Sequence, residues 1–320
     1  MVWKEIMKPK IIAILCADIH LSHKPPIWRS NEPDWYAAML RPLDEIQELQ
    51  VKYKCPVLGA GDIFDKWNSP AELINWAMIH LPKEMYSVPG QHDLPEHDYK
   101  QLYRSAYMSL ARGRCIRDMF GVIHQPLTIF NMNAVPFGWK MESVCKELKK
   151  VQWVKNIALV HDYVCTTKSD YPGAPKEAYI GKVSNDKLIN GKLYGYDVIV
   201  YGDNHKGFTA HVGKTTIFNC GTLMRRKSDE LDYKPQVGLL YSDGDVATHY
   251  LDISKDVHLT VDDTVKEAEA LDEIDMEVFA KELRKLGSSA LDFANAIKQF
   301  WTREKTKQKV QDIILKAMGE

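Results

Sequence analysis

Five short apolar segments constrain the fold of this chain most, because a cluster of acidic, amide or histidine residues directly follows each of them. The clearest segment is Met85–Pro89, which runs into Gly90-Gln91-His92-Asp93. The other clusters, in chain order, are Asp18–His20, Gly61–Asp65, His161–Asp162 and Gly202–His205. Short continuous apolar runs are typical of strands buried on both faces. Because ligands of open α/β sheets bind at the carboxyl ends of the strands, we expect the clusters to converge on one site.

The residue types in these clusters indicate a pair of divalent metal ions. Carboxylate, imidazole and amide groups are ligands of such ions, and two ions about 3.5–4 Å apart need a bridging carboxylate. We expect Asp62 to be that bridge. In this hypothesis a metal-bridging hydroxide attacks a phosphoester in line, His92 assists the leaving group, and Asp93 orients the His92 imidazole.

The order of the predicted elements indicates a mixed α/β fold. We expect strands at Ile11–Ala17, Cys55–Ala60, Met85–Pro89, Ile157–Val160, Asp197–Tyr201, Thr215–Asn219, Gln236–Tyr241 and Val246–Leu251. We expect helices at Trp35–Tyr53 after an Asp34 N-cap, from the Ser69 N-cap and Pro70 to His80, at Asp98–Arg112, and at residues 144–149. Residues 165–183 are polar and rich in Gly and Pro, which predicts a surface loop. This order predicts two packed sheets with helices outside them.

Length and composition set the outer limits of these predictions. A chain of 320 residues is long enough for one large domain and a smaller one. We place the large domain at residues 1–255 and a helical region, rich in Glu, Lys, Leu and Ala, at residues 256–320. A net charge of -1 excludes a globally basic surface for nucleic acid, but not a local basic patch.

The sequence also predicts where the protein works. No apolar run approaches about 18 residues, so we expect no membrane span. The first ten residues do not resemble a signal peptide, and the cysteines are scattered without a Cys-x-x-Cys pair. We therefore expect a reduced, cytoplasmic protein.

Taken together, the ordered motifs resemble those of the calcineurin-like metallophosphoesterase superfamily. The resemblance covers about residues 10–250 and rests on Asp18-x-His20, Gly61-Asp62-x-x-Asp65, Gly90–Asp93, His161 and Gly202-x-x-His205. Within the superfamily, Gly61–Asp65 and the turn Cys220–Leu223 are similar to the SbcD branch, the nuclease subunits of bacterial and phage DNA-repair complexes.

This resemblance implies an α/β/β/α sandwich with a dimetal centre, usually of Mn²⁺, with Mg²⁺, Fe²⁺ and Zn²⁺ as the other candidates. It implies a first ion held by Asp18, His20, Asp62 and His205, and a second held by Asp62, Gln91, His161 and Asp203. His92 takes the place of the catalytic histidine. Gln91 stands where the family has Asn, and Asp203 where it has His, so we expect an intact second site of harder character.

Four further residues are predicted to bind substrate, namely Asp65, His23, Arg225 and Arg226. The basic run Arg225-Arg226-Lys227 lies beside the predicted site and favours contact with a phosphate backbone. The resemblance implies single- or double-stranded DNA as substrate, an SMC-like ATPase partner docked on the C-terminal helices, and a homodimer.

We therefore expect an SbcD-like DNA exo- or endonuclease. Two alternatives stay open at this point. The first is a phosphatase or cyclic-nucleotide phosphodiesterase of the same fold. The second is a binding subunit in which Gln91 and Asp203 have weakened catalysis.

Overall fold

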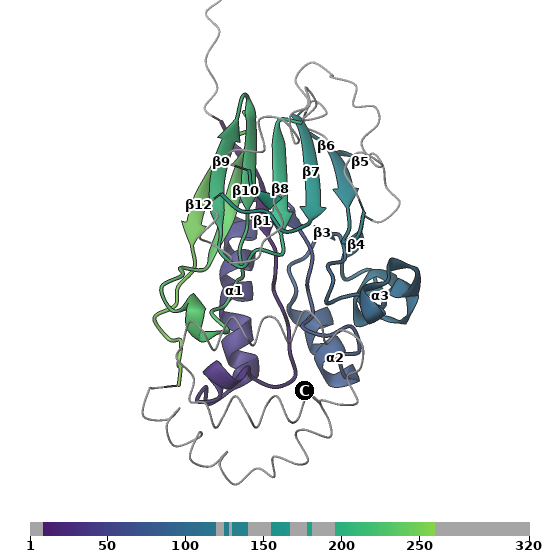
Figure 1. The fold of residues 1–320 in the computed structure, drawn as a ribbon, viewed down its shortest axis with the longest axis vertical. Helices are drawn as coiled ribbons and strands as arrows, with labels where there is room; N and C mark the ends of the chain where they lie inside the picture. The colour runs from purple at the N-terminus through teal and green to yellow at the C-terminus, as the bar shows by residue number, and fades with distance from the viewer. Residues whose placement is uncertain are drawn as a thin grey trace, which may run out of the picture. The chain divides into compact units, whose positions relative to one another are not determined.

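Two six-stranded sheets form the centre of the part of the chain that the structure, a computed structural model, describes. That part comprises residues 9–119, 125–127, 130–139, 155–166, 178–180 and 196–259. The first sheet has the order β12-β11-β1-β2-β3-β4, and the second has the order β5-β6-β7-β8-β10-β9. The mixed α/β fold with two sheets, as predicted, is confirmed (Figure 1).

The first sheet places three parallel strands at its centre. The strands of this sheet are β1 (Ile11–Cys16), β2 (Val57–Gly59), β3 (Met85–Ser87), β4 (Arg117–Asp118), β11 (Gln236–Tyr241) and β12 (Val246–Tyr250). β2 pairs in parallel with both β1 and β3, whereas β11 pairs antiparallel to β1. The carboxyl ends of β1, β2 and β3 therefore lie at one edge of the sheet.

Three helices cover the outer face of this sheet: α1 (Trp35–Tyr53), α2 (Ala71–His80) and α3 (Ala106–Arg112). The buried Met39, Leu43 and Ile46 of α1 pack in one cluster with Ile14 of β1, because helical spacing brings them to one stripe. The Asp34 side chain accepts a hydrogen bond from the backbone N–H of Ala37 (3.0 Å), as expected of an N-cap.

The second sheet packs its inner face against the first. Its strands are β5 (Gln125–Leu127), β6 (Phe130–Val135), β7 (Lys155–His161), β8 (Val198–Gly202), β9 (Phe208–Val212) and β10 (Thr215–Asn219). Ile157 and Leu159 of β7 share a cluster with Leu15 of β1, whereas Ala158 and Val160 pack on the opposite face. β6, β7 and β8 are parallel, so their carboxyl ends also meet at one edge (Figure 1).

Several element boundaries differ from the predictions. α2 begins at Ala71 with Pro70 as its N-cap, not Ser69. The predicted helix over residues 98–112 is a 3-10 helix at Tyr99–Arg104 followed by α3, because Ser105 is extended and its hydroxyl caps α3. Strand β9 was not predicted, since Phe208–Val212 mixes apolar residues with Thr and His and is not a continuous apolar run.

Some predictions fall on residues that the structure does not describe. These are the helix at 144–149, most of the loop at 165–183, and the helical C-terminal region beyond residue 259. The division at residue 255 therefore stays a prediction. Among the described helices, none is long and apolar enough to cross a membrane.

Candidate metal centre

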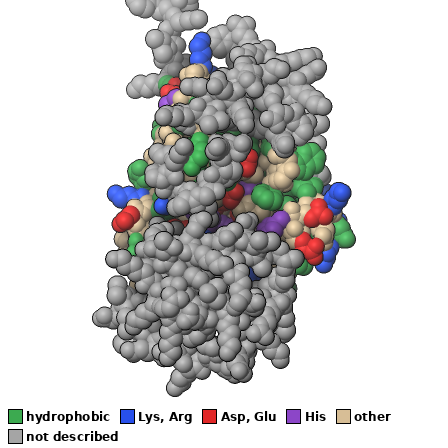
Figure 2. Space-filling model, viewed as in Figure 1, with side chains coloured by type: hydrophobic (Ala, Val, Ile, Leu, Met, Phe, Trp, Pro, Cys, Tyr) green, Lys and Arg blue, Asp and Glu red, His purple; other side chains and the backbone are tan. Residues whose placement is uncertain are grey.

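The five polar clusters lie at the carboxyl ends of β1, β2, β3, β7 and β8. Asp18 and Asp62 follow β1 and β2, His161 is the last residue of β7, and Asp203 directly follows β8. Histidine and acidic side chains are visible together across the middle of the face shown in Figure 2. The two sheets thus bring residues from positions 18 to 205 to one place, as expected from the strand-end pattern.

Asp62 stands between two groups of ligand-type atoms. Its Oδ1 accepts a hydrogen bond from the backbone N–H of His92 (2.8 Å). Its Oδ2 is buried without a hydrogen-bond partner in the part of the chain that the structure describes, 3.5 Å from Nε2 of His161 and 3.8 Å from Nε2 of His20. Burying a carboxylate oxygen without a partner costs folding free energy. This oxygen faces a histidine on each side. This is the position that a carboxylate shared by two cations requires.

The first group combines Asp18, His20 and His205, whose ligand atoms lie within 4.8 Å of one another. The Nε2 atoms of His20 and His205 are 3.0 Å apart. Two ligands at right angles on one ion, with bonds of about 2.1 Å, have the same separation. His205 donates from Nδ1 to Oε1 of the buried Glu230 (2.9 Å), which leaves Nε2 free to bind a cation.

Glu230 was not predicted from the sequence. It lies 25 residues beyond His205, in a turn whose other residues are ordinary surface types, so no spacing pattern connects the two. Its second oxygen accepts from the backbone N–H groups of Arg226 (2.6 Å) and Lys227 (3.1 Å). The carboxylate therefore holds both a candidate metal ligand and the basic turn.

The second group contains Asp18, Asp62 and His161, again within 4.8 Å. His161 donates from Nδ1 to the carbonyl oxygen of Ala60 (2.6 Å), which directs Nε2 into the site. Gln91 completes this group. Its amide oxygen lies 2.7 Å from Nε2 of His161, and its amide nitrogen donates to Asp203 (2.6 Å). The Gln91 side chain thus contacts His161 and Asp203, with which it was predicted to hold the second ion.

The backbone at these ligands is unusual. Asp18, His20, Asp62 and Asp203 all have positive φ angles, of 50°, 49°, 53° and 88°. This left-handed region is uncommon for residues other than Gly and is concentrated at functional sites, where the rest of the fold maintains it. Here backbone hydrogen bonds connect the loop after β1 to the loop after β2, from Asp18 to Gly61 and from His20 to Asp62 (both 3.0 Å).

Two glycines allow the loops to approach this closely. A Cβ atom on Gly90 would lie 2.1 Å from Oδ1 of Asp62. A Cβ atom on Gly61, whose φ is +98°, would lie 2.2 Å from Nδ1 of His161. Neither contact is tolerated, so both positions require Gly for the ligands to keep their places.

The charges of the site perturb one another strongly. Burial raises the pKa of Asp18 to about 7. Burial alone would lower the pKa of His161, but the Asp62 carboxylate raises it to about 10. Burial and then the Arg226 guanidinium hold the pKa of His20 well below its usual range. Together with the unpartnered Oδ2 of Asp62, this crowding of ligand-type groups fits divalent cations bound by Asp18, His20, Asp62, Gln91, His161, Asp203 and His205.

The structure corrects the predicted role of Asp93. Its buried carboxylate accepts hydrogen bonds from the backbone N–H groups of Ile63 (3.2 Å), Phe64 (3.0 Å) and Gly90 (3.0 Å). Asp93 therefore joins the loop after β2 to the loop after β3 and does not orient the His92 ring. That ring is held instead by Asp65, whose carbonyl oxygen accepts from Nδ1 of His92 (2.9 Å).

The predicted substrate-binding residues differ in where they point. Arg226 lies at the site, where it donates to the carboxylate of Asp65 (2.6 Å). Arg225 donates to Asp256 (3.5 Å) and to the carbonyl oxygen of Leu231 (3.1 Å), and its phosphate contact stays a prediction. His23 is partly exposed and lies 3.0 Å from the hydroxyl of Tyr36.

Comparison with known families decides what this site belongs to. The family model named "Calcineurin-like phosphoesterase" matches residues 13–207, more than half of the chain, and spans the site from Asp18 to His205. The chain belongs to the calcineurin-like phosphoesterase family. Members of this family of phosphoesterases typically use two divalent ions, and the predicted superfamily is confirmed.

Similar solved structures share little sequence with this phosphoesterase. An archaeal phosphodiesterase is 13% identical over 75% of this chain and 99% of its own, with a TM-score of 0.38. A putative 5'-nucleotidase from Staphylococcus aureus is 11% identical over 82% of this chain and 58% of its own, with a TM-score of 0.47. A phosphopantetheinyl hydrolase from Mycobacterium tuberculosis is 11% identical over 66% of this chain and 89% of its own, with a TM-score of 0.38. No curated protein matches the sequence.

Proposed function

We propose that this phosphoesterase is a dimetal phosphodiesterase that cleaves DNA, of the SbcD-like type. The observation that carries the dimetal part of the proposal is the position of Asp62, whose Oδ2 faces His161 on one side and His20 on the other. The similarity of Gly61–Asp65 and Cys220–Leu223 to the SbcD branch supports DNA as the substrate. When bound, two divalent ions would polarise a phosphate and lower the pKa of a water molecule.

His92 is the residue placed to move a proton. Its Nδ1 donates to the carbonyl oxygen of Asp65, so its Nε2 is the atom left to protonate a leaving oxygen. Its backbone N–H donates to Asp62, which keeps the ring next to the ligand groups. The His92 and His20 rings contact each other edge to face, with centroids 5.0 Å apart.

Arg226 supports a phosphate ester as substrate. A guanidinium group matches the oxygens of a phosphate in two parallel hydrogen bonds. Arg226 is nearly buried beside the site and forms an ion pair with Asp65, and its Nε has no hydrogen-bond partner among the described residues. A substrate phosphate would take the place of Asp65. The SMC-like ATPase partner and the homodimer stay predictions, since the C-terminal helices lie outside the described residues.

The test uses purified protein, Mn²⁺, and end-labelled single- and double-stranded DNA. The variant is His92→Ala, and the matched control is His211→Ala on β9, an exposed histidine outside the site. We expect chelator-sensitive cleavage that falls at least about 100-fold in His92→Ala and stays unchanged in the control. Turnover of p-nitrophenyl phosphate without DNA cleavage would make the protein a phosphatase. DNA binding without any hydrolysis would make it a binding subunit.

A further inference from the structure

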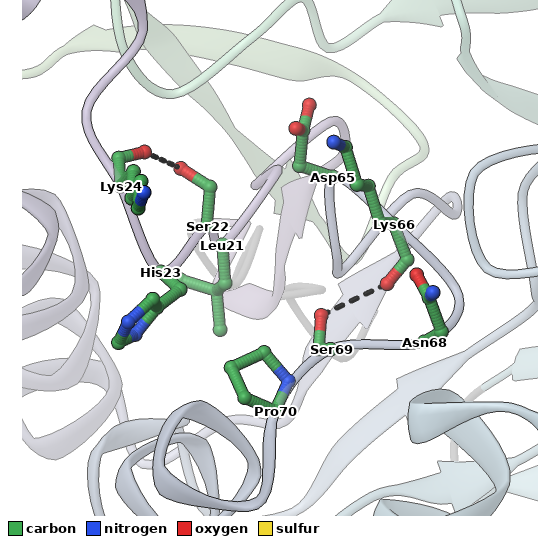
Figure 3. Close-up of a pocket in the computed structure, with 9 residues that line it drawn as sticks. All are labelled: Leu21, Ser22, His23, Lys24, Asp65, Lys66, Asn68, Ser69 and Pro70. Atoms are coloured by element: carbon green, nitrogen blue, oxygen red, sulfur yellow. Dashed lines mark hydrogen bonds between the residues drawn. The ribbon is translucent and has the colours of Figure 1, made fainter.

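A pocket of about 220 Å³ lies beside the metal centre (Figure 3). Two loops line it, residues 21–24 after β1 and residues 65–70 after β2. Asp65 belongs to both places, because it lines the pocket while its carboxylate lies 4.0 Å from Nδ1 of His20. The pocket and the candidate metal centre therefore adjoin at Asp65.

The pocket is held in shape by hydrogen bonds within and between its loops. The backbone N–H of Asp65 donates to the carbonyl oxygen of Leu21 (2.9 Å), which connects the two loops. The hydroxyls of Ser22 and Ser69 each donate to a backbone carbonyl of their own loop, at 2.9 and 2.8 Å (Figure 3). A site that is already ordered loses less entropy when it binds a ligand.

The lining combines an apolar surface with donors and positive charge. Leu21 and Pro70 supply apolar surface, and Asn68 supplies an amide. Two exposed lysines, Lys24 and Lys66, also line the pocket. Asp65 supplies a carboxylate to the lining, and the Glu72 carboxylate lies 3.8 Å from His23, so Lys24 and Lys66 are the lining groups that an anion would contact.

His23 adds an imidazole that is held in one orientation. Its Nδ1 lies 3.0 Å from the hydroxyl of Tyr36, and the Tyr36 ring packs edge to face on Trp76 (centroids 5.5 Å apart). An oriented ring is a surface on which a nucleobase stacks, as bases do on aromatic side chains in proteins that bind single strands.

We propose that this pocket binds the nucleotide adjacent to the scissile phosphate of a single DNA strand, with Lys24 and Lys66 contacting its phosphate. The proposal rests on the proposed function and names the part of the substrate beyond the reacting group. Pockets for drug-sized ligands are about 300–1,000 Å³. The smaller volume here suits one nucleotide and not a longer segment.

The test compares two double variants with the same change in charge. Lys24→Ala/Lys66→Ala removes the pocket lysines. Lys10→Ala/Lys214→Ala removes two exposed lysines that precede β1 and β10, at the edges of the sheets opposite the site. Binding of a fluorescent single-stranded oligonucleotide is measured by anisotropy in Ca²⁺, over a series of salt concentrations.

We expect the pocket variant to bind about tenfold more weakly, with the slope of log Kd against log salt lower by about 0.7 for each lost phosphate contact. We expect the control to keep the wild-type slope. A second variant, Asn68→Leu, replaces the pocket amide by a side chain that is neither charged nor aromatic, and it should weaken binding. Equal slopes in the two double variants, or full binding by Asn68→Leu, would overturn the proposal.

Hydrolysis of bis-p-nitrophenyl phosphate in Mn²⁺ separates the pocket from the proposed function. This ester carries no nucleobase and no second phosphate, so all three variants should hydrolyse it at the wild-type rate. If the wild-type protein hydrolyses neither this ester nor DNA, the proposed function fails, while the binding series still decides the pocket. If hydrolysis occurs and the pocket variants bind like the control, only the pocket proposal fails.

Discussion

His205 and Glu230 form a hydrogen bond of 2.9 Å between Nδ1 and Oε1, and Glu230 is buried behind the ring. Such a carboxylate fixes the tautomer and direction of a metal-binding histidine. Because the other oxygen of Glu230 accepts from the backbone of Arg226, one side chain positions both the candidate ligand and the arginine that we propose to bind phosphate.

Loss of this hydrogen bond should weaken metal binding at the first group. In Glu230→Ala we expect Mn²⁺ affinity to fall about 10- to 100-fold, because His205 loses its orientation. Isothermal titration measures the change, with Glu72→Ala, an exposed glutamate on α2, as the control. An unchanged affinity in Glu230→Ala would show that His205 is not a ligand held in this way.

Gly90→Ala should damage the metal centre through a steric clash. The new Cβ would lie 2.1 Å from Oδ1 of Asp62, and overpacking of this kind costs about 1–3 kcal/mol of unfolding free energy. We expect both the unfolding free energy and the Mn²⁺ affinity to fall. Denaturant unfolding with and without Mn²⁺ measures both changes.

The matched control is Gly213→Ala, whose φ is +60° and whose Cβ would meet nothing within 4 Å. Its backbone strain should cost about 1–2 kcal/mol, but leave metal affinity unchanged. Equal metal affinity in the two variants would contradict the clash at Asp62.

Metal binding should release protons and strengthen as pH rises. With a pKa of about 7 for Asp18 and about 10 for His161, the metal-free site holds protons at neutral pH that a cation must displace. Both pKa values are raised, so protons compete more strongly as pH falls. We expect weaker Mn²⁺ binding at pH 6 than at pH 8. Titration calorimetry in buffers of different ionisation enthalpy counts the protons, and no release at either pH would contradict these shifts.

The sequence predicted the candidate ligands better than the residues that support them. Strands β10 and β11 match their predicted bounds, and nearly all of their residues are buried. Asp18, Asp62 and His161 were predicted as ligands because each follows a short apolar segment. Glu230 could not be found this way, since its contact with His205 depends on how a distant turn folds back.

The same dependence of contacts on how a loop folds explains where the structure differs from the predicted contacts. Asp93 stands next to His92 in the sequence, yet its carboxylate is used by backbone N–H groups of another loop. Arg225 and Arg226 are adjacent, but the turn directs one toward Asp256 and the other toward Asp65. Neighbours in sequence point to different partners here because the backbone of each loop sets their direction.

The number of Mn²⁺ ions bound per chain tests the central claim most directly. The account has two ions sharing Asp62, one with Asp18, His20 and His205 and one with Gln91, His161 and Asp203. Elemental analysis of protein equilibrated with Mn²⁺ should give two ions per chain in the wild type and fewer than one in Asp62→Ala, with Asp98→Ala, a mutation outside the site, keeping two. One ion per chain in the wild type, or two in Asp62→Ala, would contradict a centre bridged by Asp62.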